Sequence, residues 1–426
     1  MSQPSSPSSP ARLHALDAVR GLALILGIFF HASMSYYPGD PMWIIMDTQR
    51  SEALFGTGFV LHIFRMTTFF LLAGFFGRMV YHRMGAGRFA LSRLKRIGIP
   101  LVVFWPMMMA AFTAIIIWSI AAQYGAAALE GAPPPPPLTA ETFPLTHLWF
   151  LYVLLMFYAA MIVARPLIAL LDFGGAGRKL IDRFISATLE TPFLPALLAI
   201  PAAAAFLTHT GWLEWLGVPT PDTGIVPNTT ALIAYGTAFL FGWALQRQGE
   251  NVMRIQTLWP LHLVLAGAFT AVCWYLIGGH TQMTPALEGS DKTVYACAYA
   301  VAMWFWTFGL IGAALKFFSG ESKMRRYLAD SSYWLYIIHL PIVIALQVWT
   351  FKWGWPAEAK YAFILGLSIP LMLLSYHVLV RYSFIGGVLN GKRQPRKSKQ
   401  TPEREHDEAK QYRSGSRRSR LHQIGR

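Results

Sequence analysis

Ten long apolar segments constrain the fold of this chain more than any other feature of its sequence. They cover residues 18–37, 57–81, 97–122, 147–171, 193–208, 229–246, 258–278, 294–318, 331–351 and 361–383. A bilayer core of about 30 Å is crossed by about 20 mainly apolar residues in a helix, so these segments predict membrane spans. With 54% hydrophobic and 13% charged residues, the composition also excludes an ordinary soluble protein. We therefore expect an all-α polytopic membrane protein, a bundle of about ten transmembrane helices.

The distribution of positive charge predicts how these helices are oriented. If the N-terminus is cytoplasmic, the inner loops and the N-terminal flank carry 18 Lys and Arg residues, and the outer loops carry only 4. Cytoplasmic loops of membrane proteins are enriched in Lys and Arg. Both termini are therefore expected in the cytoplasm. This orientation accounts for the net charge of +15 without a nucleic-acid partner. The expected partner is the lipid bilayer.

The chain divides into three parts. Residues 1–11 form a leader rich in Ser and Pro that we expect to be disordered, and residues 12–385 form the membrane domain. Residues 386–426 form a basic tail, expected to be disordered and solvated, although its cations could also contact anionic lipid. Cys273 and Cys297 are expected to be free thiols, and no metal-ligand spacing is present, so no metal is expected.

Three ionisable side chains lie well inside the first two predicted spans, away from their inner ends, where such groups suggest a functional site. At about 1.5 Å per residue, His31 lies about 9 Å below the outer end of the first span. The second span runs the other way, which places His62 and Arg65 about 7 to 12 Å below the same boundary. His62 and Arg65 are three residues apart and share a helix face. The sequence therefore predicts two imidazoles and one guanidinium at one depth.

This combination of groups favours acyl transfer, with His31, His62 and Arg65 as the catalytic residues. A neutral imidazole can take the proton of an attacking hydroxyl, and a fixed guanidinium can stabilise the oxyanion formed on a thioester carbonyl. The alternative is structural: both histidines would be hydrogen-bonded between helices, with Arg65 paired to backbone carbonyls. No Asp or Glu lies in these spans to orient His31.

A second group of cations is expected at the cytoplasmic end. Arg20 lies about 16 Å below His31 along the first span. The segment RFALSRLKRIGIP places Arg93 and Arg96 on one helix face at the inner end of the third span. Such a cluster could bind the phosphates of coenzyme A. The simpler interpretation is the general excess of positive charge on this side, and only the pairing with His31 favours phosphate binding.

The same segments resemble a known family. LDAVRGLALILGIFFH separates Arg20 and His31 by ten residues, and four further motifs follow: HIFRMTTFFLLAGFFGR, SRLKRIGIP, THLWFLYVLLMF and SSYWLYIIHLP. Their order resembles the acyltransferase-3 family of membrane proteins over roughly residues 12 to 383. The resemblance implies a multi-pass enzyme of the bacterial inner membrane. It would move an acyl group from cytoplasmic acyl-CoA to a hydroxyl of an extracytoplasmic glycan.

The resemblance also implies a role for each matching residue. His31 would be the catalytic base and Arg20 a partner of the acyl donor. The rest of the catalytic set would be His62 and Arg65, and the rest of the donor-binding set Arg93, Arg96 and His339. His339 is expected near mid-membrane, either beside the path of the thioester or in a bond between helices.

His147 and Trp149 lie at the outer mouth of the fourth predicted span. The resemblance implies that they bind the acceptor, since an aromatic ring can stack on a sugar, but Trp is also common at membrane interfaces for structural reasons. The motifs look most like a branch that places succinyl groups on osmoregulated periplasmic glucans. On this resemblance alone we expect succinyl-CoA in preference to acetyl-CoA. One departure is Ala73, where the family often has Ser.

Two other functions stay open. In a proton-coupled transporter or exporter, His31, His62 and His339 would form a relay. Relays usually include buried carboxylates, and these spans have essentially none, which counts against that hypothesis. A non-catalytic scaffold that binds lipid or glycan would need neither the cations nor His31.

Overall fold

The computed structural model describes residues 9–130, 136–172 and 174–391, and these residues form helices and no strands. Each predicted span corresponds to one helix. The ten helices are α1 (Ser9–Ser33), α2 (Glu52–Met84), α4 (Ile99–Tyr124), α5 (Trp149–Leu171), α7 (Phe193–Thr208), α8 (Thr229–Leu245), α9 (Trp259–Ile277), α10 (Gly289–Phe317), α11 (Lys323–Thr350) and α12 (Ala357–Ser375). Shorter helices are α3 (Ala86–Arg93), α6 (Ala176–Thr188) and α13 (Phe384–Asn390). The predicted class, an all-α polytopic membrane protein, is confirmed.

Not every predicted span is equally long. Eight helical segments of the described chain are long and apolar enough to cross a membrane. A ninth would be the pair α6 and α7, which is bent by 119° at its break, and α8 has only 17 residues. The cytoplasmic position of both termini stays a prediction, as do the three domain limits. The predicted leader and tail fall largely outside the described residues.

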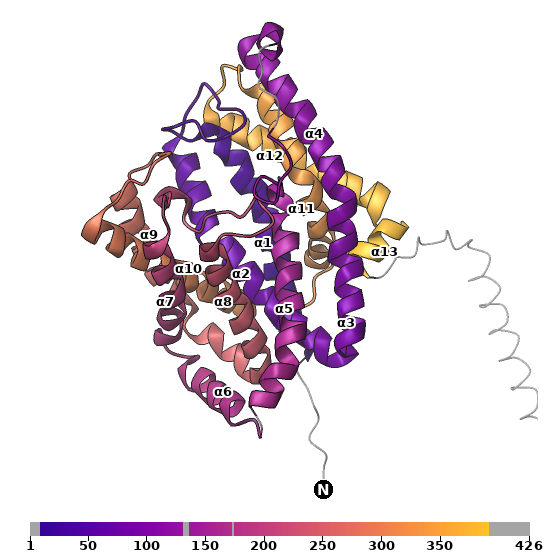
Figure 1. Ribbon diagram of the computed structural model, residues 1–426, viewed down its shortest axis with the longest axis vertical. Coiled ribbons are helices and arrows are strands. Elements are labelled where there is room, and N and C mark those ends of the chain that lie inside the picture. The colour runs from indigo at the N-terminus through magenta and orange to yellow at the C-terminus, as the bar shows by residue number, and fades with distance from the viewer. Residues whose placement is uncertain (1–8, 131–135, 173, 392–426) are drawn as a thin grey trace, which may run out of the picture.

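The helices form an inner group and an outer group. In α2, 83% of the apolar window is buried within the protein, and in α10 and α11 the share is 72%. The segment Ala86–Tyr124, which contains α4, buries only 17% of its window. Figure 1 shows α4 running along the edge of the bundle. Its exposed apolar side chains are those expected of a surface that faces lipid, because lipid tails are as apolar as they are.

The position of α2 depends on its close approach to α8. A side chain at Gly74 would collide with the carbonyl oxygen of Phe239, and one at Gly242 would collide with the carbonyl oxygen of Leu71. Small residues let two helix backbones come together, and here one glycine on each helix does so. The crossing fixes α2, the helix that carries His62 and Arg65.

A loop of residues 38–51 covers the C-terminal end of α1, and a buried ion pair anchors it. The Lys360 ammonium of α12 donates to both carboxylate oxygens of Asp47, at 2.8 and 3.0 Å, and both side chains are 1% exposed or less. The amide N–H of Asp47 also donates to the carbonyl of Ser35, at 2.8 Å. A buried pair is costly to break because the remaining charge would be left without a partner.

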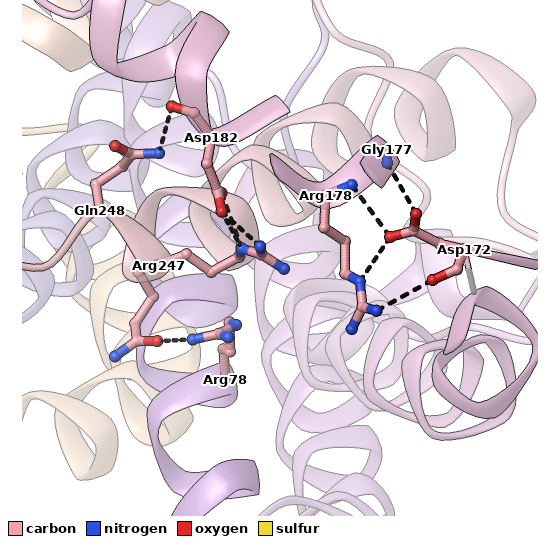
Figure 2. A network of polar contacts seen from close by, with 8 residues as sticks. Arg78, Asp172, Gly177, Arg178, Asp182, Arg247 and Gln248 are labelled. Atoms are coloured by element: carbon pink, nitrogen blue, oxygen red, sulfur yellow. Dashed lines mark hydrogen bonds and ion pairs between the residues drawn. The ribbon is translucent and has the colours of Figure 1, made fainter. Parts of the chain in front are cut away.

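A different polar network fastens α6 to the segment after α8. Figure 2 shows Asp182 of α6 between Arg247 and Gln248. The Arg247 guanidinium donates through Nε to Asp182, at 2.8 Å, and the amide of Gln248 donates to the Asp182 carbonyl, at 3.1 Å. At the start of α6, Arg178 donates to the carboxylate of Asp172, at 2.6 Å. These predicted inner cations therefore have protein partners.

Candidate active site

A cavity of about 490 Å³ is lined by six of the predicted site residues. Its walls come from α1, α2, α4 and α11, the start of α5, the loop 38–51 and the segments around residues 144 and 222. The predicted residues that line it are His31, His62, Arg65, His147, Trp149 and His339. Segments that are far apart in the sequence thus bring four imidazoles and one guanidinium to one space.

Stacking holds the His31 ring in place. The indole of Trp43 lies against it, with ring centroids 5.7 Å apart and an angle of 17° between the planes. The Trp43 N–H donates to the Gln347 side-chain oxygen, at 2.9 Å, and the Gln347 amide donates to the His31 carbonyl, at 3.0 Å. No carboxylate in the described part of the chain bonds to the His31 ring. Trp43 therefore supplies the orienting contact that the sequence left unassigned.

Two neighbouring histidines have their tautomers fixed by carbonyl groups of α11. Nδ1 of His339 lies 2.7 Å from the carbonyl oxygen of Tyr336, and Nε2 of His147 lies 2.9 Å from that of Ile337. A carbonyl oxygen only accepts, so each of these nitrogens must carry the proton. In the neutral rings the other nitrogens, Nε2 of His339 and Nδ1 of His147, therefore carry a lone pair. Both are buried without a hydrogen-bond partner in the described structure.

The motif that contains His339 explains why the Ile337 carbonyl is available. Pro341 follows Ile337 by four residues inside α11 and has no N–H to donate back to it. The freed carbonyl accepts the bond from His147 instead. The rings of His147 and His339 then meet edge to face, with centroids 5.4 Å apart, and His339 lies 5.2 Å from His31. Three imidazoles therefore form a continuous row.

Arg65 is buried without an acidic partner. Arg65 is only 7% exposed, and its Nε has no hydrogen-bond partner in the described structure. The guanidinium carbon lies 4.8 Å from the centre of the Phe30 ring. A Cβ atom placed at Gly27 would lie 2.8 Å from Nη1 of Arg65 and 4.0 Å from Nε2 of His339. The missing side chain at Gly27 therefore lets the Arg65 guanidinium approach α1 closely, one helical turn below His31, while His339 is at an ordinary contact distance.

His62 and Arg65 meet His31 around one aromatic ring. The Phe30 ring stacks on the His62 ring and meets the His31 ring edge to face, with both pairs of ring centroids 4.9 Å apart. The Arg65 guanidinium also lies over the Phe30 ring. Both ring nitrogens of His62 are buried and have no partner in the described structure. The structure thus brings these three residues together, while their catalytic roles stay predictions.

The predicted acceptor-binding residues lie inside the cavity wall. His147 is 6% exposed and Trp149 is 7% exposed. The Trp149 indole stacks on Tyr235, with centroids 5.6 Å apart. His147 and Trp149 therefore line the same cavity as His31 and are more deeply buried than residues at a surface mouth would be. Their role in binding the acceptor stays a prediction.

The remaining residues predicted to bind the donor do not line this cavity. Arg20 lies near the middle of α1, Arg93 ends α3, and Arg96 follows α3. Arg20 forms an ion pair with Asp17, at 3.1 Å. The Arg93 guanidinium lies between the rings of Phe89 and Tyr158, at 5.1 and 5.3 Å, and its buried Nε has no partner in the described structure. The carbonyl of Arg96 accepts a bond from the Tyr333 hydroxyl, at 2.8 Å. Among the predicted donor-binding residues, only His339 reaches the cavity.

Sequence reasoning missed Trp43, Gln347 and Asp222. Gln347 carried a usable signal, because a polar amide inside the predicted span 331–351 must find a partner in the membrane. Trp43 and Asp222 lie in loops between the predicted spans and carried no such signal. In the described chain, no group of three or more His, Cys, Asp or Glu side chains is arranged to hold a metal ion.

Comparison with known proteins defines the class. The profile of the acyltransferase-3 family, described as an acyltransferase domain, matches residues 13–377. The chain therefore belongs to the acyltransferase-3 family. This confirms two predictions, namely that the protein is an acyltransferase and that it is a multi-pass membrane protein.

Particular relatives carry the name glucans biosynthesis protein C, the branch whose motifs this sequence resembles. The proteins of that name from Shigella dysenteriae serotype 1 (strain Sd197) and Escherichia coli (strain SMS-3-5 / SECEC) are 31% identical to the chain over 103 residues. The protein from Escherichia coli (strain K12) is 30% identical over the same length. Each match covers 24% of this chain and 26% of the relative, so it spans about a quarter of either protein. No solved structure matches the chain.

Proposed function

We propose that this protein moves an acyl group, succinyl or acetyl, from cytoplasmic acyl-CoA to a hydroxyl of an extracytoplasmic glycan, as a multi-pass protein of the bacterial inner membrane. The observation that carries the proposal is the cavity itself. It holds the His31 imidazole beside an unpaired guanidinium and two further imidazoles that present lone pairs. These are the groups needed to move a proton and to stabilise a negative oxygen.

In the proposed reaction His31 acts as general base. It takes the proton of the acceptor hydroxyl while the hydroxyl oxygen attacks the thioester carbonyl and forms a carbon–oxygen bond. Arg65 stabilises the oxyanion that develops on that carbonyl. The carbon–sulfur bond then breaks, and the departing thiolate of coenzyme A takes the proton back from the His31 imidazolium. The products are the acylated glycan and free coenzyme A, and no protein nucleophile is used.

The donor is proposed to enter from the end where Arg20, Arg93 and Arg96 lie. The buried Nε of Arg93, which has no partner in the described structure, supports an anionic ligand there. The phosphates of coenzyme A would occupy this region, and the pantetheine arm would extend toward His339. Arg20 is only partly available, because Asp17 already pairs with it.

For the acyl group and the acceptor, we propose succinyl and a periplasmic glucan. A succinyl group carries a free carboxylate, which a cation in the cavity could bind. Arg65 carries the only guanidinium or ammonium group among the described residues that line the cavity. The glucan acceptor is supported by the name of the relatives, which covers a quarter of the chain. An acetyl group has no carboxylate, so in acetyl transfer Arg65 would interact only with the oxyanion.

One observation keeps a second candidate, a proton-coupled transporter. His31, His339 and His147 form a row with ring centroids 5.2 and 5.4 Å apart, close enough for a water molecule to link them in a proton relay. Relays in membranes usually include carboxylates, and Asp222 at the rim is the only one among the described residues that line the cavity.

The test compares cells that carry the intact chain, a deletion, and His31→Ala at equal protein level. Mass spectrometry of the periplasmic glucan and other surface glycans measures the acyl substituents. We expect the increment to vanish in the deletion and to fall by about 10²-fold or more in His31→Ala. His262→Ala is the matched control, because His262 is buried in α9 but does not line the cavity, and it should keep the increment.

Each outcome decides between the candidates. If the increment survives His31→Ala, then His31 is structural and the proposed mechanism is wrong. If no glycan changes even on deletion, acyl transfer to a glycan fails and the transporter becomes the better hypothesis. The mass of the increment identifies the acyl group as succinyl or acetyl.

A further inference from the structure

Two segments outside the apolar spans, residues 140–146 and 217–225, are joined across the rim of the cavity. We call this pair the rim clasp. Three main-chain bonds join them: the N–H groups of Thr146, Gly224 and Ile225 donate to the carbonyls of Asp222, Phe143 and Ala140, at 2.9, 2.9 and 2.8 Å. The Trp105 N–H donates to the Pro144 carbonyl, at 2.8 Å, and ties the clasp to α4. These bonds hold the rim in one conformation.

Asp222 places a carboxylate at this rim. It is the only acidic residue among the described residues that line the cavity, where Thr146 and Thr220 also contribute. Its side chain is open to the cavity mouth, yet surrounding protein atoms remove part of its hydration, and this desolvation raises the pKa of the carboxyl. No Lys or Arg forms an ion pair with it in the described structure. The Thr223 hydroxyl donates to Oδ1 of Asp222, at 3.5 Å, and the remaining lone pairs of the carboxylate can accept further hydrogen bonds.

Thr146 is held in an unusual backbone conformation beside Asp222. Its φ of 49° makes it the only described residue other than glycine with a positive φ. A β-branched residue rarely adopts this conformation, and such strain tends to occur at functional sites. The bond from its N–H to the Asp222 carbonyl holds it there. Its hydroxyl oxygen is buried without a partner in the described structure, and His147 follows directly.

We propose that Asp222 and Thr146 form the binding site for an uncharged carbohydrate acceptor at the mouth of the cavity. The carboxylate accepts hydrogen bonds from sugar hydroxyls, and the Thr146 hydroxyl bonds to a neighbouring sugar oxygen. One hydroxyl of the bound sugar then points down the cavity toward His31. The site would disfavour acceptors that carry phosphate at this position, because Asp222 repels them. This inference rests on the proposed acyl transfer and assigns the residues that bind its acceptor.

The chain offers well-matched variants for a test. Asp222→Asn keeps the shape of the side chain and removes its charge, and Thr146→Val keeps the β-branch and removes the hydroxyl. Glu141→Gln is the control, because Glu141 lies in the same clasp and is exposed but does not line the cavity. Thermal unfolding of the full chain in lipid nanodiscs checks that each variant is folded.

Binding is measured first without any donor. Three linkage isomers of a glucose tetrasaccharide, namely maltotetraose, cellotetraose and sophorotetraose, are titrated into the nanodiscs. For the isomer that binds most tightly, we expect Asp222→Asn to raise the dissociation constant about tenfold or more, since it removes a charged acceptor. Thr146→Val should raise it about threefold to tenfold, and Glu141→Gln should leave it unchanged. Equal affinity of the wild type and both site variants would overturn the proposal, as would a wild type that binds no tetrasaccharide.

Acyl transfer is measured second, with succinyl-CoA and the same tetrasaccharide. A site for the acceptor predicts a higher KM for the sugar in Asp222→Asn and an unchanged KM for succinyl-CoA. Equal rises in both KM values would assign Asp222 a structural role and overturn the proposal. If the sugar binds through Asp222 but the wild type transfers no acyl group, the proposed function fails and the carbohydrate site stands.

Discussion

The cavity around His31 and the network around Asp182 treat charge in opposite ways. In the network, Asp182 pairs with Arg247 and Asp172 pairs with Arg178, so each of these two cations has a carboxylate partner, and Arg78 donates to the side-chain oxygen of Gln246 (Figure 2). In the cavity, Arg65 is buried with no acidic partner in the described structure. Burying an unpaired charge raises the free energy of the folded state, and no ion pair compensates for that cost. The contrast separates polar residues that hold helices together from those that our proposal assigns to a ligand.

The largest effect expected from this contrast is that of Arg65→Met. Transfer should fall by about 10²- to 10³-fold, because the variant loses the group that stabilises the oxyanion. The melting temperature should stay equal or rise, since replacing an unpaired buried charge with an apolar side chain removes its desolvation cost. Steady-state transfer assays and thermal unfolding in nanodiscs measure both quantities on one preparation.

Arg65→Lys serves as the control for this prediction. It keeps the positive charge but loses the planar fork of donors, so its rate should lie between those of the wild type and Arg65→Met. A variant Arg65→Met that unfolds at a much lower temperature and transfers normally would place Arg65 in the structural class, with the network residues.

A smaller effect is expected from the residue that orients His31. Trp43→Ala removes the stacked ring, and a contact of this kind contributes about 0.5–1.5 kcal/mol, so kcat should fall about tenfold at most. Trp43→Phe keeps a ring over His31 and loses only the bond to Gln347, so it should retain more of the activity. The measurement is kcat at saturating donor and acceptor. Identical kcat values for Trp43→Ala and the wild type would show that stacking does not position His31.

The smallest effect on activity is expected in the network. The side chains of Arg247 and Asp182 are 24% and 31% exposed, and such partly exposed pairs contribute about 1 kcal/mol or less. Asp182→Asn should therefore lower the melting temperature slightly and leave transfer within about twofold of the wild type. If Asp182→Asn instead reduces transfer more than stability, the network belongs to the path of the donor.

The sequence predicted that three candidate residues lie close together, because membrane depth can be counted along a helix. His31, His62 and Arg65 were placed at one level by the rise per residue alone, and in the structure they gather around Phe30. The rotation of each helix could not be predicted, because an apolar face looks the same whether it meets lipid or another helix. For that reason Arg20, Arg93 and Arg96 could be assigned to one end of the bundle but not to a common pocket.

The sequence by itself determined the class of this protein, its ten helical segments and the residues at the level of His31, since the bilayer acts on each apolar segment separately. Only the tertiary structure decided how these residues are held. Pro341 frees the carbonyl that fixes His147, Trp43 comes from a loop to cover His31, and Asp222 is joined to Thr146 across the rim. Each of these contacts joins segments that are distant in the chain, and their meeting depends on how the whole bundle packs.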